Sequence, residues 1–141
     1  MAREDVRAVA IEIFSSIDGC ESIIKTTGEY KYVEDEDKHV VVFTDYTGNT
    51  ITKNGLEICT DKLFLHRTGG FNGDMLFDLN VDTIMKYAAY MVSSDFLIHT
   101  NRYEVSKDKN QLMVKVDYLL RDVTGKTEDI TARQIITIMG L

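Results

Sequence analysis

The residue of this sequence that is best suited to bind a ligand is Arg67. It follows Leu63 and Leu65 at a spacing of two, shortly before the Gly69-Gly70 pair. In a strand this spacing places the three side chains on one face, so Arg67 would share an apolar face near a strand end. A guanidinium there can hold a carboxylate through two hydrogen bonds, as the headgroup of an amphipathic molecule requires. In the alternative, structural role, Arg67 packs across the rim and donates to backbone carbonyls.

Three further polar side chains are candidates for the same site. Tyr87 and Tyr118 would add hydroxyl groups to it, although tyrosines in a β-rich core mostly serve as amphipathic packing residues. Gln134 interrupts an otherwise apolar row near the C-terminus. We therefore predict a ligand-binding site made of Arg67, Tyr87, Tyr118 and Gln134, without a cofactor.

The residues that commonly bind metals show no converging pattern. His39, His66 and His99 fall on three different expected strands, and random placement explains them better than a metal site does. The acidic run at 34–37 lacks the order of a calcium-binding loop and is typical of a solvated hairpin tip. We expect no metal site.

The nucleophile-bearing residues are equally uninformative about catalysis. Cys20 and Cys59 lack CxxC spacing and are interpreted as free thiols in a reducing compartment, with a disulfide as the less favoured alternative. No Ser-His-Asp or Cys-His arrangement has local sequence support. The sequence thus shows no catalytic motif, and a hydrolase or isomerase acting through Arg67, Tyr87 or a histidine is only a remaining hypothesis.

Length and composition narrow the class of protein. The 141 residues match one domain, 1–141, and 44% hydrophobic with 28% charged residues is typical of a soluble globular chain. The net charge of −7, from 16 basic and 23 acidic residues, disfavours nucleic acid as a partner. The longest wholly apolar stretch, 87–92, has six residues, whereas a membrane helix needs roughly 20. We expect a cytoplasmic protein without a membrane or nucleic-acid partner.

The elements that must position these side chains are predicted to be β-strands. Turn residues recur every 8–15 positions, no proline is present, and the segments between turns alternate with period two. The clearest strand, 112–121, places Leu112, Val114 and Val116 on one face and Lys115 and Asp117 on the other. Eight or nine strands are expected, with two of the following segments fused: 6–16, 20–32, 39–46, 50–59, 62–68, 73–78, 83–89, 95–105, 111–121 and 128–139.

Two segments are ambiguous between strand and helix. Ala2 to Phe14 carries Val6, Ala10 and Ile13 at helical spacing, but its β-branched content and the following turn favour a strand. Thr83 to Val92 is similarly ambiguous, and its context favours a strand. The fold is therefore predicted as all-β, with a short N-terminal helix as the alternative to the first strand.

A sheet of this size leaves two exposed edges unless it closes on itself. We therefore predict a single antiparallel meander barrel of about 8–10 strands. The double-sided apolar runs at 40–43 and 63–65 are expected to be covered on both faces.

Several segments resemble a known family, the YwiB-like bacterial proteins of unknown function, which are classed by shape with the calycin (lipocalin-like) barrels. The resemblance is carried, in order, by Thr26-Thr27-Gly28-Glu29-Tyr30, Leu65-His66-Arg67-Thr68-Gly69, Phe77, Thr83, Tyr87 and Thr100. It implies a closed antiparallel barrel and a cytoplasmic bacterial setting, and it implies no activity.

Two functions follow as hypotheses. The first is a non-catalytic barrel that binds a small apolar or amphipathic ligand in its interior, motivated by the calycin resemblance and by Arg67. The second is a protein-interaction module with a filled barrel, which associates with itself as a homo-oligomer or pairs with another protein.

Overall fold

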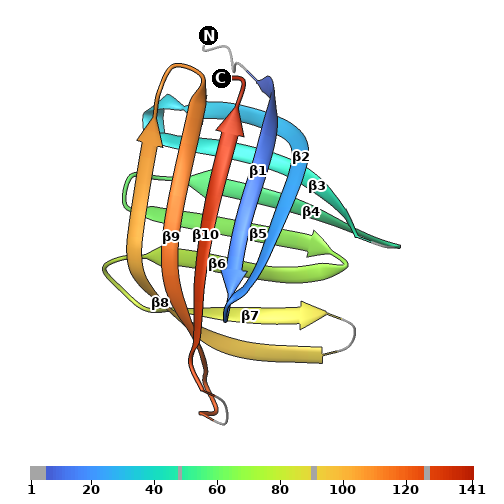
Figure 1. The fold of residues 1–141 in the computed structure, drawn as a ribbon, viewed down its shortest axis with the longest axis vertical. Helices are drawn as coiled ribbons and strands as arrows, with labels where there is room; N and C mark the ends of the chain where they lie inside the picture. The colour runs from blue at the N-terminus through green and yellow to red at the C-terminus, as the bar shows by residue number, and fades with distance from the viewer. Residues whose placement is uncertain (1–5, 48, 90–91, 126–127) are drawn as a thin grey trace.

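The residues that the structure describes form ten antiparallel strands around a closed barrel, in the order β1-β10-β9-β8-β7-β6-β5-β4-β3-β2 (Figure 1). This computed structural model describes residues 6–47, 49–89, 92–125 and 128–141. The strands are β1 (Arg7–Ile17), β2 (Cys20–Val33), β3 (Lys38–Thr47), β4 (Thr50–Ile58), β5 (Lys62–Gly69), β6 (Phe71–Asp78), β7 (Thr83–Ala89), β8 (Val92–Lys107), β9 (Gln111–Asp122) and β10 (Ile130–Met139). A 3-10 turn, Glu34–Glu36, links β2 to β3.

Alternating side chains determine which face of each strand is buried. In β9, Leu112, Val114 and Val116 are fully buried while Lys115 is exposed, because successive residues of a strand point to opposite sides of the sheet. The same alternation holds in β10, where Ile136 and Ile138 are buried. The apolar faces of β9 and β10 therefore line the inside of the barrel.

The buried apolar side chains form one cluster inside the barrel. Along β10, the buried positions change from Ile138 and Ile136, nearest the C-terminus, to Gln134. Along β4, they change from Ile58 and Leu56 to Asn54 and Thr52. The fully buried members of the core include Ile11, Val41, Leu56, Ile58, Leu63, Phe77, Ile98, Leu112, Val114, Ile136 and Ile138.

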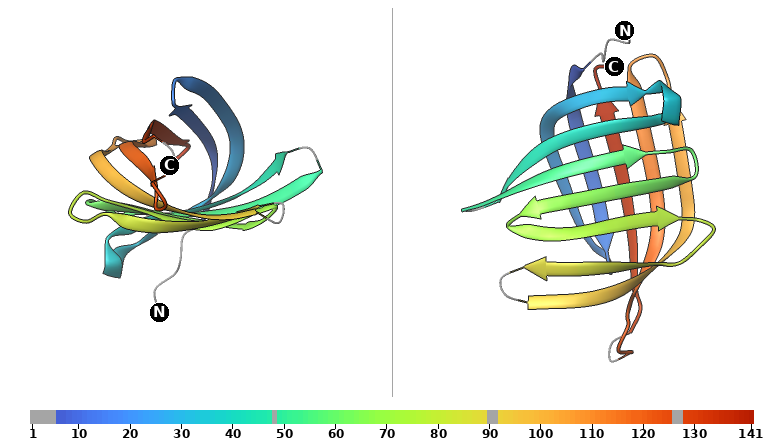
Figure 2. Two further views of the ribbon diagram at one scale, coloured as in Figure 1. Left: turned by 90° about the horizontal axis from the view of Figure 1, so that it is seen from below. Right: turned by 180° about the vertical axis from the view of Figure 1, so that it is seen from behind.

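The two edges of β2 are paired over different lengths. Its 11 pairs with β1 run from Arg7↔Tyr30 to Ile17↔Cys20, but its pairing with β3 covers only six positions, from Gly28↔Phe43 to Val33↔Lys38. Figure 2 shows the β1–β2 and β3–β4 hairpins diverging beyond this point. Residues 20–27 therefore form a strand segment with one paired edge.

Gly28 lies where the pairing of β2 with β3 begins. A Cβ atom there would lie 2.4 Å from the carbonyl oxygen of Val42 and 2.8 Å from Cδ1 of Ile11. Both distances are shorter than real Cβ contacts, so only glycine fits between the inward-facing Ile11 and the β3 backbone.

The predicted all-β meander barrel is confirmed, with some corrections in detail. The described parts of the two ambiguous segments are strands, in β1 and β7, whereas residues 2–5 and 90–91 of these segments lie outside the described residues. The ten predicted segments correspond to ten separate strands among the described residues, so the expected fusion of two was wrong. The apolar run at 40–43 is not covered on both faces, because the outward side chain of Val42 is exposed. In the part of the chain that the structure describes, no helix is long and apolar enough to cross a membrane.

Candidate functional site

A group of polar side chains lies inside the barrel, beyond the apolar core. Each occupies an interior-facing position that the alternation of its strand would otherwise give to an apolar residue. Four of them are at most 8% exposed: Thr52 and Asn54 on β4, Thr100 on β8 and Gln134 on β10. Arg67 on β5 and Tyr118 on β9 complete this group, which we call the interior polar cluster.

Strand register sets the positions within the cluster. Asn54 on β4 lies opposite Arg67 on β5, which in turn lies opposite Gly73 on β6. Because Gly73 has no side chain, β6 contributes none to the interior at the position opposite Arg67. On the β8–β9 part of the barrel wall, Thr100 of β8 lies opposite Tyr118 of β9.

Tyr118 connects the cluster to the core. Its ring packs edge-on against Phe77, with ring centroids 4.7 Å apart and an interplanar angle of 63°. Burial raises the pKa of its hydroxyl to about 12, while the positive charge of Arg67 and a hydrogen bond with Gln134 act in the opposite direction. Tyr118 therefore stays protonated at neutral pH and is near both polar groups.

Two buried atoms of the cluster lack a hydrogen-bond partner among the described residues: Nε of Arg67 and Oγ1 of Thr100. Buried polar groups in proteins are nearly always paired, because an unpaired group loses its bonds to water without compensation. A cationic donor and a hydroxyl with unused hydrogen-bonding capacity fit a ligand that brings acceptor oxygens, above all an anionic one. The interior polar cluster therefore contains one unpaired cationic N–H donor and one unpaired hydroxyl.

The site predicted from the sequence is brought together in part. Arg67, Tyr118 and Gln134 all face the interior, and Tyr118 interacts with both of the others. The backbone of Tyr87 lies on β7 opposite Gly73, in the row next to Arg67, but its side chain lies outside what the structure describes. The expected alternative for Arg67, bonds to backbone carbonyls, does not apply to its Nε–H.

Three members of the interior polar cluster were not predicted from the sequence: Thr52, Asn54 and Thr100. The alternation that identified Arg67 also contains them, because Thr52 and Asn54 precede Leu56 at a spacing of two and Thr100 follows Ile98 in the same way. Threonine is enriched in strands, so Thr52 and Thr100 alone do not distinguish a site from an ordinary wall position. Asparagine is depleted in strands, so Asn54 is the more informative of the three.

The interior face also has an apolar part that reaches solvent. Ile17 and Ile24 point inward on the β1–β2 hairpin, yet they remain 42% and 38% exposed, because residues 20–27 have no partner on β3. Ile17 lies opposite Ala132, and Ser15 lies opposite Gln134. An accessible apolar surface thus borders the polar cluster.

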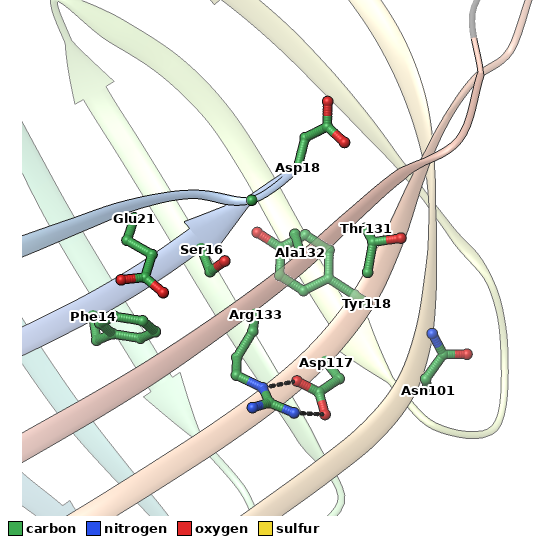
Figure 3. Close-up of a pocket in the computed structure, with 11 residues that line it drawn as sticks. Phe14, Ser16, Asp18, Glu21, Asn101, Asp117, Tyr118, Thr131, Ala132 and Arg133 are labelled. Carbon is green, nitrogen blue, oxygen red and sulfur yellow. Dashed lines mark hydrogen bonds and ion pairs between the residues drawn. The ribbon is translucent and has the colours of Figure 1, made fainter.

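A groove of about 560 Å³ lies on the wall formed by β1, β10, β9 and β8 (Figure 3). The carboxylate of Asp117 binds the Arg133 guanidinium there at 2.6 Å (Oδ1–Nε) and 3.1 Å (Oδ2–Nη2). The hydrogen bond from Arg133 lowers the pKa of Asp117. Tyr118 and Ala132 also line the groove, although their side chains are inward-facing.

The three histidines, His39, His66 and His99, have separate partners and do not form a common site. His39 hydrogen-bonds the Tyr30 hydroxyl at 2.7 Å, His66 contacts Asp74, and His99 contacts Asp82 at 2.6 Å. Within the described ranges, no group of three or more His, Cys, Asp or Glu side chains is arranged to hold a metal ion. Cys20 and Cys59 are free thiols.

By its architecture, the protein is a ten-stranded antiparallel β-barrel whose interior contains the interior polar cluster. Residues 12–132 match the model of a family described as a domain of unknown function, DUF1934, and the chain belongs to this family. A solved structure, the YwiB protein from Bacillus subtilis, is similar to this chain with a TM-score of 0.78 and 16% identity. The similarity covers 98% of this chain and 95% of YwiB. No curated protein matches the chain.

Proposed function

We propose that this protein is a non-catalytic, cytoplasmic binding protein. It would bind a small amphipathic molecule with an anionic head inside its barrel, as calycin barrels hold ligands in their interior. The observation that carries the proposal is the Arg67 Nε–H, buried inside the barrel with no acceptor among the described residues. A guanidinium in that position gains a charge-assisted hydrogen bond when a carboxylate enters.

The second half of the proposal concerns the apolar part of the ligand. Ile17 and Ile24 are inward-facing and accessible beside the cluster. Burial of apolar surface contributes about 25 cal/mol per Å², so a hydrocarbon tail along these residues would be stabilised while its head contacts Arg67. The entry route is the side where β2 and β3 diverge.

The headgroup is tested by comparing molecules of one chain length. We expect decanoate to bind with 1:1 stoichiometry and to raise the melting temperature, and decanol to bind more weakly by titration calorimetry. Replacing Arg67 by Met keeps the aliphatic stem and removes the charge, and it should weaken decanoate binding about tenfold or more while leaving decanol unchanged. Equal binding of decanoate by the wild type and the variant would refute the proposal.

A test without a chosen ligand complements this one. Protein purified from its native source is extracted with organic solvent, and the extract is examined by mass spectrometry for a stoichiometric compound. The proposal predicts an acidic amphiphile, and only neutral or cationic compounds at stoichiometric amounts would contradict it.

A further inference from the structure

The unpaired edge of β2 offers a second, independent function. Residues 20–27 pair with β1 on one side and, in the described part of the chain, with no strand on the other. An open edge presents unused N–H and C=O groups, which favour pairing with another strand. Ile23 lies in the middle of this edge and is 59% exposed.

The turn before β2 determines which residues of β2 point their backbone N–H and C=O groups toward the open edge. Asp18 and Gly19 form a two-residue turn with φ of 52° and 82°, as in a type I′ hairpin. The flanking pair, Ile17↔Cys20, is then hydrogen-bonded, and every second pair after it is bonded as well. The even-numbered residues of β2 consequently bond to β1, and Glu21, Ile23 and Lys25 present their N–H and C=O groups at the open edge.

We propose that this edge pairs with the same edge of a second copy of the chain, antiparallel and with the two-fold axis at Ile23. Glu21 then lies opposite Lys25 of the partner subunit, Ile23 lies opposite the partner's Ile23, and all three positions exchange hydrogen bonds. A two-fold axis at Glu21 or at Lys25 would instead place like charges opposite each other, which is destabilising. The sequence of the edge is therefore complementary to itself in one register.

The outward face of the wall continues this complementarity. One row is apolar across β10, β1 and β2, Ile135–Phe14–Ile23, and it would continue into the same row of the partner subunit. The next row runs Asp117–Arg133–Ser16–Glu21, so that the partner's Lys25 extends an alternation of charge. The self-paired sheet thus joins apolar to apolar and acidic to basic positions.

The proposal is tested by charge reversal. We expect the wild type to show a concentration-dependent dimer in sedimentation equilibrium. Glu21→Lys and Lys25→Glu should each raise the dimer dissociation constant about tenfold, because each creates two like-charged pairs. The double variant E21K/K25E should restore dimerisation. The matched control is Glu29→Lys, an exposed residue in the part of β2 that pairs with β3, and it should leave the dissociation constant unchanged.

Hydrogen exchange gives a second readout at unaltered sequence. The amides of Glu21, Ile23 and Lys25 should become protected as the concentration rises, whereas other exposed amides should not change. A wild-type protein that stays monomeric at millimolar concentration would overturn the proposal. It would also be overturned if E21K and E29K had equal effects, or if the double variant failed to dimerise while folded by circular dichroism.

Discussion

Arg67 on β5 and Tyr118 on β9 lie near each other inside the barrel, close enough that the guanidinium charge opposes the rise in the pKa of Tyr118 that burial causes. The two residues come from separate parts of the wall and are 51 positions apart in the sequence. Arg67 keeps a buried Nε–H that finds no acceptor among the described residues, although Tyr118 is near. This unused donor makes the interior a candidate binding site rather than only a packed core.

Removing the charge of Arg67 should not destabilise the protein. Because its Nε–H already lacks a partner, Arg67→Met removes a desolvated group and retains most of the packing of the stem. We expect the free energy of unfolding, measured in urea, to stay within about 1 kcal/mol of the wild type or to rise.

Arg133→Met serves as the comparison for that variant. Arg133 is largely exposed and paired with Asp117, so its loss should cost no more than about 1 kcal/mol. A loss of about 3 kcal/mol in Arg67→Met would show that Arg67 is a structural residue, as in the alternative role considered for it.

The hydrogen bond between Tyr118 and Gln134 should stabilise the folded protein. Tyr118→Phe keeps the edge contact with Phe77 but leaves the buried Gln134 amide without this partner, so we expect a loss of about 1–3 kcal/mol. Adding Gln134→Leu to this variant removes both polar groups and should recover part of the loss. Purely additive losses in the double-mutant cycle would contradict the pairing.

Alternation along individual strands made much of this structure predictable. It placed Arg67, Tyr118 and Gln134 on the interior face, and it identified Leu112 and Val114 as core residues. The uneven closure was not predictable, because the register between β2 and β3 depends on contacts between strands, such as the close approach at Gly28. The unpaired Nε–H of Arg67 also follows from the arrangement of several strands, which no single segment of sequence contains.

The imidazole of His39 should make stability depend on pH. Burial, and to a lesser extent the charge of Lys107, lower its pKa below the ordinary value of 6.5. The unfolded chain therefore binds a proton at a higher pH than the folded chain, and stability falls as the pH drops from about 7 toward 5. His39→Gln should reduce this slope in urea unfolding, whereas the exposed His99→Gln should retain the contribution of His39. An unchanged slope in His39→Gln would be inconsistent with this account.

The two thiols should differ in reactivity. Cys20 is exposed, whereas burial raises the pKa of Cys59 and reduces its thiolate fraction. With a disulfide reagent at pH 8 and micromolar protein, we expect one thiol to react quickly and the second to react slowly, and Cys20→Ser should abolish the fast phase. A fast phase that persists in Cys20→Ser would contradict the assignment.

The central claim, that Arg67 receives an anionic headgroup inside the barrel, is tested most directly by the NMR signal of its Nε–H. The signal is assigned by its loss in Arg67→Met and is followed during a titration with decanoate, with decanol as the control. We predict a saturable downfield shift of the proton with decanoate and little change with decanol. An Arg67 Nε–H signal that stays unchanged while decanoate binds would show that the headgroup lies elsewhere.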